Sequence, residues 1–201
     1  MRSTIAVIGP IAGGKGSIGE LLINRGYSQF TYRAEVQKEV LRRGLPLERA
    51  AFQDVSDSLR VEFGADILAR RIAASIEQAR SQGSAEKAII DGLRHPHEVQ
   101  WVKDNFRTRV IGVTAPPEIR FQRLLTRARG SDTLTREGFE LSDRRDRGIG
   151  QPEYGQQGDA CLPLADFLIE NTGTPGQLEQ NLGEVLVSLG IEGPMRTRER
   201  R

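Results

Sequence analysis

The sequence predicts a three-layer α/β domain in which helices cover both faces of a five-stranded parallel sheet. Two observations lead to this prediction. Short apolar segments of strand length alternate along the chain with longer segments of helical periodicity, and this alternation is typical of parallel sheets with right-handed crossovers. A glycine-rich loop at residues 9–17 also lies between the first strand and the first helix, where this fold class places an anion-binding turn.

Each expected element follows from its local pattern. Strands are expected at residues 4–8, 27–31, 88–90, 109–113 and 166–170, where short apolar runs end in polar or glycine residues. Helices are expected at 18–25, 34–43, 47–63, 65–82, 96–106, 117–129 and 175–189, where apolar residues recur at helical spacing or a proline suits the first turn. Residues 130–158 are polar, with a short helix expected at 136–145, and a connection of this length predicts a lid or disorder.

The composition fits one globular domain over residues 1–190. The 201 residues are 37% hydrophobic and 28% charged, with a net charge of +2. Residues 191–201 form a basic run, for which a disordered, solvated terminus is favoured over contact with nucleic acid or a membrane. We therefore expect no nucleic-acid partner and no membrane partner.

Cysteine content and apolar runs indicate the compartment. Cys161 is the only cysteine, so the chain contains no disulfide framework, and a reducing cytoplasm is the expected setting. The N-terminal residues run directly into the expected first strand, so we expect no signal peptide. No apolar run reaches the length of a membrane span.

The glycine-rich loop has the residues of a phosphate site. Glycines let backbone N–H groups wrap closely round an anion, the helix N-terminus adds positive potential, and Lys15 would bridge the terminal phosphates. The pattern G-x-x-x-x-G-K-[ST] is met through Lys15, but Gly16 follows and the hydroxyl comes one place later. The candidate phosphate-binding residues in this loop are Gly9, Gly13, Gly14, Lys15, Gly16 and Ser17. The alternative is a glycine-rich turn that binds nothing.

The G-K-G-S spacing resembles the loop of adenylate kinases and other nucleoside monophosphate kinases. The segment Asp91-Gly92-Leu93-Arg94 is similar to the D-G-x-P-R pattern that follows the third strand of adenylate kinases. This resemblance implies that Asp91 and Ser17 organise Mg²⁺ and that Arg94 holds the acceptor phosphate. The alternative is an ordinary Asp-Gly turn beside a surface arginine.

Acceptor recognition is the least specific part of the resemblance. Where nucleoside monophosphate kinases have T-G-D-x-x-R, this chain has Thr31-Tyr32-Arg33, so Thr31 and Arg33 are proposed as acceptor ligands. In P-loop kinases the helical segment after the second strand, here about residues 32–82, binds the acceptor.

Arginines are concentrated before and within the expected lid. The chain has 29 basic residues, only four of them lysines, a bias that codon usage or phosphate recognition could produce. Residues 120–147 contain eight arginines and no lysine, so here the clustering exceeds the background. Arg123 and Arg127 match the R-x-x-x-R that enters the lid of nucleoside monophosphate kinases, which implies a catalytic role for both, with Lys15 and Asp91. Arg144 and Arg145 are expected to bind the acceptor. The alternative is a solvated salt-bridged face with Asp143 and Asp146.

The end of the chain resembles another kinase family. Residues 165–174, A-D-F-L-I-E-N-T-G-T, are similar to the A-D-x-x-I-x-N-x-G-[ST] pattern of dephospho-CoA kinases, which implies that Asn171 and Gly173 pack on the donor adenine. The alternative is a strand followed by a helix cap at Thr174.

Together these resemblances imply an ATP-dependent kinase, with Mg²⁺ as cofactor, that phosphorylates a nucleoside or deoxynucleoside monophosphate as a monomer or homodimer. Dephospho-CoA kinase is the close alternative. A nucleotide-binding regulator or slow ATPase is the alternative from another class.

Overall fold

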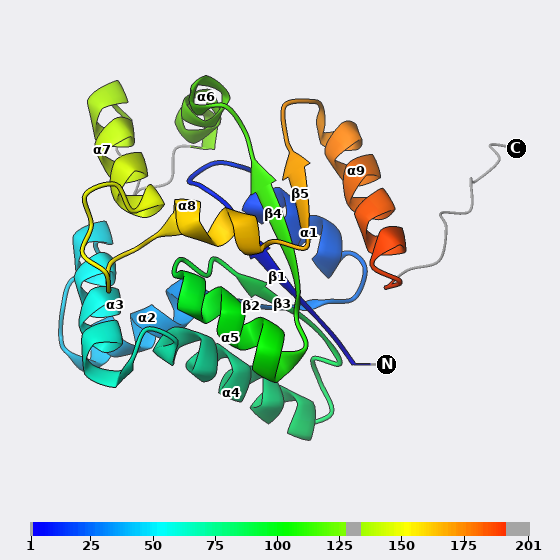
Figure 1. Ribbon diagram of the computed structural model, residues 1–201, viewed down its shortest axis with the longest axis horizontal. Coiled ribbons are helices and arrows are strands. Elements are labelled where there is room, and N and C mark those ends of the chain that lie inside the picture. The colour runs from blue at the N-terminus through cyan, green and yellow to red at the C-terminus, as the bar shows by residue number, and fades with distance from the viewer. Residues whose placement is uncertain (1, 128–133, 192–201) are drawn as a thin grey trace, which may run out of the picture.

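The computed structural model describes residues 2–127 and 134–191. Five parallel strands form one sheet in the order β2-β3-β1-β4-β5. They are β1 (Ser3–Ile8), β2 (Ser28–Thr31), β3 (Lys87–Asp91), β4 (Arg109–Thr114) and β5 (Phe167–Glu170). The predicted five-stranded parallel sheet is therefore confirmed (Figure 1). Residues 128–133 of the helix end and lid, and residues 192–201 of the expected tail, lie outside the described residues.

The helices connect and cover these strands. They are α1 (Lys15–Ile23), α2 (Tyr32–Arg42), α3 (Arg49–Phe63), α4 (Ile67–Ser81), α5 (Pro96–Phe106), α6 (Pro117–Arg127), α7 (Arg136–Arg147), α8 (Gly158–Cys161), the 3-10 turn η1 (Leu162–Leu164) and α9 (Pro175–Ser188). α2 begins two residues before the expected start because the Thr31 side chain accepts a hydrogen bond from Ala34 N at 3.0 Å. α8 and η1 were not expected from the sequence. None of the helices in the described part of the chain has the length and hydrophobicity needed to cross a membrane.

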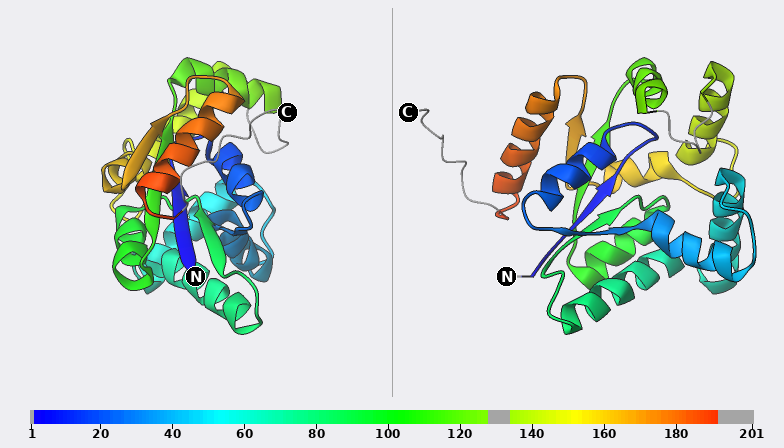
Figure 2. Two further views of the ribbon diagram at one scale, coloured as in Figure 1. Left: turned by 90° about the vertical axis from the view of Figure 1, so that its right-hand side faces the viewer. Right: turned by 180° about the vertical axis from the view of Figure 1, so that it is seen from behind.

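Alternation along the strands builds two cores, one on each face of the sheet. Ile5 and Val7 of β1 pack with α1 and α9, while Ala6 and Ile8 pack with α2 to α5 on the opposite face. Figures 1 and 2 show α1 and α9 on one side of the sheet and α4 and α5 on the other. The predicted three-layer arrangement follows directly from this period-two pattern.

A buried ionic network joins three helices on the larger face. The guanidinium of Arg60 on α3 donates to Glu98 Oε1 on α5 at 3.1 Å and to the Tyr32 hydroxyl on α2 at 2.5 Å. Glu98 Oε2 in turn accepts the backbone N–H groups of Arg94 and His95, at 2.9 and 3.1 Å. Burial raises the pKa of Tyr32 to about 12, although nearby Arg60 opposes this shift. The network therefore fixes the backbone that carries Arg94.

Replacing Glu98 by alanine should lower the free energy of unfolding by about 3–5 kcal/mol, because Arg60 would keep its charge in the interior without a carboxylate. Gln100→Ala on the same helix removes only an exposed contact with Asp104 and should change stability by less than about 0.5 kcal/mol. Urea unfolding of both variants measures the difference. Equal stabilities would show that the Arg60–Glu98 pair does not hold α3 to α5.

Candidate active site

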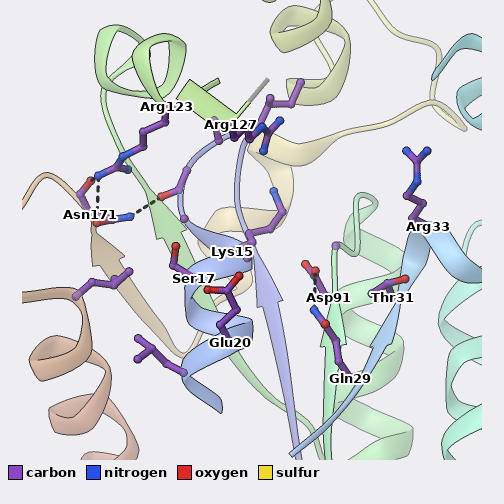
Figure 3. A pocket seen from close by; sticks show the side chains of 18 of the residues that line it. Lys15, Ser17, Glu20, Gln29, Thr31, Arg33, Asp91, Arg123, Arg127 and Asn171 are labelled. Atoms are coloured by element: carbon purple, nitrogen blue, oxygen red, sulfur yellow. Dashed lines mark hydrogen bonds between the residues drawn. The ribbon is translucent and has the colours of Figure 1, made fainter. Parts of the chain in front are cut away.

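The candidate site is a cavity of about 1090 Å³ at the carboxyl edge of the sheet. In the sheet, β1 lies between β3 and β4. The connection that follows β1 leads to one edge of the sheet, and the connection that follows β3 leads towards the other edge. Open parallel sheets bind their ligands at this position. Figure 3 places Lys15 and Ser17, at the start of α1, in the middle of the cavity, and Figure 1 shows α6 beyond the carboxyl ends of the strands with α7 over α3.

Two glycines let the loop approach its neighbours closely. Gly9 has φ +149°, and a Cβ there would lie 2.0 Å from the backbone oxygen of Val113 on β4. Gly14 has φ +123°, and a Cβ there would lie 2.3 Å from Asn171 Nδ2. Neither position accepts a larger residue without displacing backbone or a fixed amide. Packing alone therefore requires glycine at both positions, independently of the anion-binding role that the sequence predicts.

Lys15 opens α1 and lies in the cavity. Its Nζ donates to the backbone oxygens of Gly9 and Pro10, at 2.6 and 2.9 Å. Burial, and after it the positive charge of Arg94, lower the pKa of Lys15 to about 7, although Asp91 acts in the opposite direction. An incoming polyphosphate would offer this ammonium an anionic partner in place of two carbonyls.

Asn171 connects three parts of one cavity wall. Its Nδ2 donates to Gly13 O at 3.1 Å, and its backbone oxygen accepts from Arg123 Nη2 at 2.9 Å (Figure 3). The second terminal nitrogen of Arg123, Nη1, is buried and has no hydrogen-bond partner in the described part of the chain. This nitrogen is available to an anionic ligand, and Gly173 lines the same side of the cavity.

Arg120 holds the helix that carries Arg123 against the loop. It donates to the backbone oxygen of Ile11 at 3.2 Å and makes a two-pronged ion pair with Asp143 of α7, with one contact at 2.9 Å. Arg120 is only 3% exposed. The sequence analysis counted this arginine in the cluster but gave it no role, because its position on α6 does not reveal that a carboxylate faces it.

The opposite cavity wall comes from β2, β3 and the start of α2. Asp91 at the end of β3 accepts a hydrogen bond from Gln29 Nε2 through Oδ2, at 3.1 Å. Thr31 and Arg33 lie on the same side as Asp91 in Figure 3 and face Asn171 and Arg123 across the loop. The structure therefore brings Thr31 and Arg33, two of the predicted acceptor residues, into the same cavity as the predicted donor residue Asn171.

Arg94 lines the cavity and is paired with a carboxylate from α7. Its Nη1 forms an ion pair with Asp146, and its backbone oxygen accepts a 2.8 Å hydrogen bond from Gln157 N. Asp143 and Asp146 are 6% and 3% exposed, so the alternative of a solvated salt-bridged face is wrong for these two residues. They are buried counter-ions for cavity arginines.

Two arginines of α7 lie away from this cavity. Arg145 forms ion pairs with Asp54 at 3.0 Å and Asp57 at 3.4 Å, both on α3, and Arg144 is exposed. Neither is among the residues that line the cavity, whereas Arg127 of α6 is. The structure therefore gives Arg145 a different role from the predicted one: it holds α7 to α3.

The residues present fit a magnesium ion that is held mainly by a nucleotide. Among the described residues, no group of three His, Cys, Asp or Glu side chains could hold a metal by itself. Ser17 and Asp91 line the same cavity and supply a hydroxyl and a carboxylate, the oxygen ligands that suit Mg²⁺. Because Mg²⁺ usually keeps several waters and phosphate ligands, one or two protein groups are sufficient.

Comparisons with known proteins agree with this architecture. The family model described as AAA domain matches residues 5–145. A UPF0200 protein of Pyrobaculum aerophilum is 32% identical over 191 residues, covering 94% of this chain and 99% of that protein. The solved structure of TT1252 from Thermus thermophilus has a TM-score of 0.58 and 24% identity, covering 94% of this chain and 98% of that one. Shikimate kinase from Acinetobacter baumannii has a TM-score of 0.53 and 16% identity, covering 96% and 97%. The structure therefore has a P-loop kinase-like fold.

The lowered pKa of Lys15 predicts that polyphosphate binding takes up a proton. Above pH 7 the free amine is largely neutral, and a bound polyphosphate raises its pKa, so affinity should fall as pH rises from 7 towards 9, by at most about tenfold per pH unit. Calorimetry at pH 8 with a non-hydrolysable ATP analogue, in two buffers of different ionisation enthalpy, measures the proton. Lys15→Arg keeps its charge and should bind without this proton. The same proton uptake in both proteins would assign it to another group.

Proposed function

We propose that this chain, which belongs to the AAA-domain family and to the UPF0200 proteins, is an ATP-dependent phosphotransferase whose acceptor is a nucleoside or deoxynucleoside monophosphate. One observation supports this most directly. A single cavity connects the glycine-rich loop with a second wall that carries Thr31, Arg33 and Arg94. Its volume of about 1090 Å³ is slightly above the usual range for one small ligand, which suits two phosphorylated ligands that meet end to end.

At the donor end, the loop amides and Lys15 hold the β- and γ-phosphates of ATP. Lys15 exchanges its contacts with Gly9 and Pro10 for phosphate oxygens, and Arg123 offers its unpaired Nη1. Asn171 and Gly173 bound the donor side of the cavity. Ser17 and Asp91 would help to hold Mg²⁺, which would neutralise part of the phosphate charge.

At the acceptor end, Arg94 orients the monophosphate, and Thr31 and Arg33 bound its site. An acceptor phosphate oxygen attacks the γ-phosphorus, the bond from that phosphorus to the β–γ bridging oxygen breaks, and ADP leaves. Arg127 and Arg123, which line the cavity from α6, stabilise the charge on the transferring group. Closure of α6 and α7 over the cavity would exclude water, the role that the sequence predicts for the lid.

An acceptor panel tests this proposal. ADP release should require one of the nucleoside or deoxynucleoside 5′-monophosphates and should yield its diphosphate, and Lys15→Ala should lower kcat by about 10²-fold while the protein still folds. Phosphorylation of dephospho-CoA and of none of the nucleotides would identify the chain as a dephospho-CoA kinase. Tight ATP binding without acceptor-dependent ADP release would indicate a regulator or slow ATPase and would refute the proposal.

Arginines at the two ends should affect different kinetic parameters. Arg94→Ala and Arg94→Lys should raise the acceptor KM, because both lose a planar fork to the phosphate, and the lysine variant still offers Asp146 a cation. Arg127→Ala should mainly lower kcat, since its contact belongs to the closed state.

Arg147→Ala is the matched control, because this α7 arginine pairs with Asp159 at 2.9 Å and lies outside the cavity. Its kinetics should be near those of the unmodified chain. Steady-state assays at saturating ATP with varied acceptor measure all four variants. An unchanged acceptor KM in both Arg94 variants would show that a residue other than Arg94 binds the acceptor phosphate.

A further inference from the structure

We infer that the α3 side of the cavity is a pocket for a planar nucleobase, with Phe52 and Arg33 as the stacking surface and the Gln53 and Gln156 amides reading the base edge. This inference rests on the proposed function, because it assigns the part of the acceptor that extends beyond the phosphate. It separates base-bearing acceptors from sugar or cyclic-acid acceptors, which have no aromatic ring to stack.

The stacking surface is already formed. Phe52 on α3 and Arg33 on α2 both line the cavity, and the Arg33 guanidinium carbon lies 4.3 Å from the centre of the Phe52 ring. Phe52 is 8% exposed, whereas Arg33 is exposed at the cavity edge. Aromatic rings and guanidinium planes both stack favourably on the faces of nucleobases. A base that enters here can therefore extend an existing stack.

Gln156 carries an unsatisfied acceptor beside this surface. Its side chain is 4% exposed and lines the cavity, and its Oε1 has no hydrogen-bond partner in residues 2–127 and 134–191. A buried carbonyl oxygen without a hydrogen-bond donor destabilises the unliganded protein, because it has lost its water without gaining a partner. A ligand with an amino or ring N–H group would satisfy it, and every common nucleobase offers one.

The position of Gln156 relative to the acceptor phosphate ligand is fixed by the backbone. Gln157 N donates to Arg94 O at 2.8 Å, so the segment that carries Gln156 is attached to the residue proposed to hold the phosphate. Asp146, shortly before this segment on α7, pairs with the Arg94 side chain. The residue proposed to bind the phosphate, Arg94, is therefore hydrogen-bonded to the segment that carries the residue proposed to contact the base edge, Gln156.

Gln53 supplies a second amide next to Phe52. It is 8% exposed and lines the cavity, while Ser56 one turn later uses its hydroxyl to donate to the Phe52 backbone oxygen at 2.6 Å. The carboxamide of a glutamine has a donor and an acceptor side by side, which complements the paired donor and acceptor of a base edge. Two such amides in one cavity can pair with the edge of a base, while the selection against ligands without an aromatic ring comes from the stacking surface.

Direct binding tests the pocket without requiring turnover. Isothermal calorimetry would compare CMP, UMP, dTMP, AMP and GMP with ribose 5-phosphate, using the unmodified chain and a non-hydrolysable ATP analogue. At least one nucleotide should bind at least tenfold more tightly than ribose 5-phosphate, because only the nucleotides carry a base. Equal affinity for all these ligands would overturn the inference.

Gln156→Ala should lower the affinity for the preferred nucleotide about tenfold and leave that for ribose 5-phosphate unchanged. Gln157→Ala is the matched control, because the Gln157 side chain donates to Glu153 O at 2.8 Å and is not among the cavity-lining residues. Gln156→Met preserves the side-chain length and removes the amide, so it replaces the alanine variant in this test if that variant does not fold. Equal effects at 156 and 157, or an equal loss for ribose 5-phosphate, would overturn the inference.

The two proposals can fail separately. Base-selective binding that depends on Gln156, without phosphate transfer to any acceptor, would retain the pocket and reject the kinase. Transfer to nucleoside monophosphates with the same base preference in Gln156→Ala as in the unmodified chain would retain the kinase and reject the pocket.

Discussion

The close approach of the glycine-rich loop to β4 and to Asn171 is the constraint on which the rest of the site depends. No Cβ fits at Gly9, which touches the Val113 backbone, or at Gly14, which touches the Asn171 amide. The same contacts place Lys15 at the first position of α1 and leave Gly16 and Ser17 exposed to the cavity. A loop displaced outward by one methyl group would lose both the Asn171 hydrogen bond to Gly13 and the alignment of its N–H groups.

Buried ion pairs then determine where the arginines point. Arg120 with Asp143, and Arg94 with Asp146, connect α6 and the β3–α5 connection to a single helix, α7. Buried pairs of this kind add little net stability, because both charges lose water, but leaving one partner alone is costly. These pairs instead orient the arginines, because a carboxylate holds each guanidinium at the cavity. From the sequence, both aspartates were expected only as part of a solvated surface. Any opening of α7 must therefore supply new partners, either water or ligand oxygens, for two arginines.

The sequence alone predicted the features that depend on a repeated pattern or on residues close together in the chain. Strand and helix alternation predicted the parallel sheet and its three layers, and the loop pattern predicted the position of Lys15 at the start of a helix. Contacts between distant segments were not predictable in the same way. The pairing of Arg145 with α3, the role of Arg120 and the burial of Gln156 depend on how residues 134–157 pack, and that polar segment has no periodicity to indicate a partner. α7 is amphipathic mainly through Phe139 and two aspartates, so its buried face is largely ionic.

The concentration of positive charge gives the cavity its chemical character. Burial together with Arg94, Arg127 and Arg120 makes a protonated Lys15 unfavourable, which is why its pKa falls to about 7. Asp143 and Asp146 form ion pairs with Arg120 and Arg94, whereas the Lys15 ammonium donates its hydrogen bonds to the backbone oxygens of Gly9 and Pro10. The lysine is thus the group whose charge depends most on what enters the cavity. Under the proposed function, a polyphosphate at the loop would meet arginines already held in place and would raise the pKa of Lys15, so that binding would be coupled to protonation of this lysine.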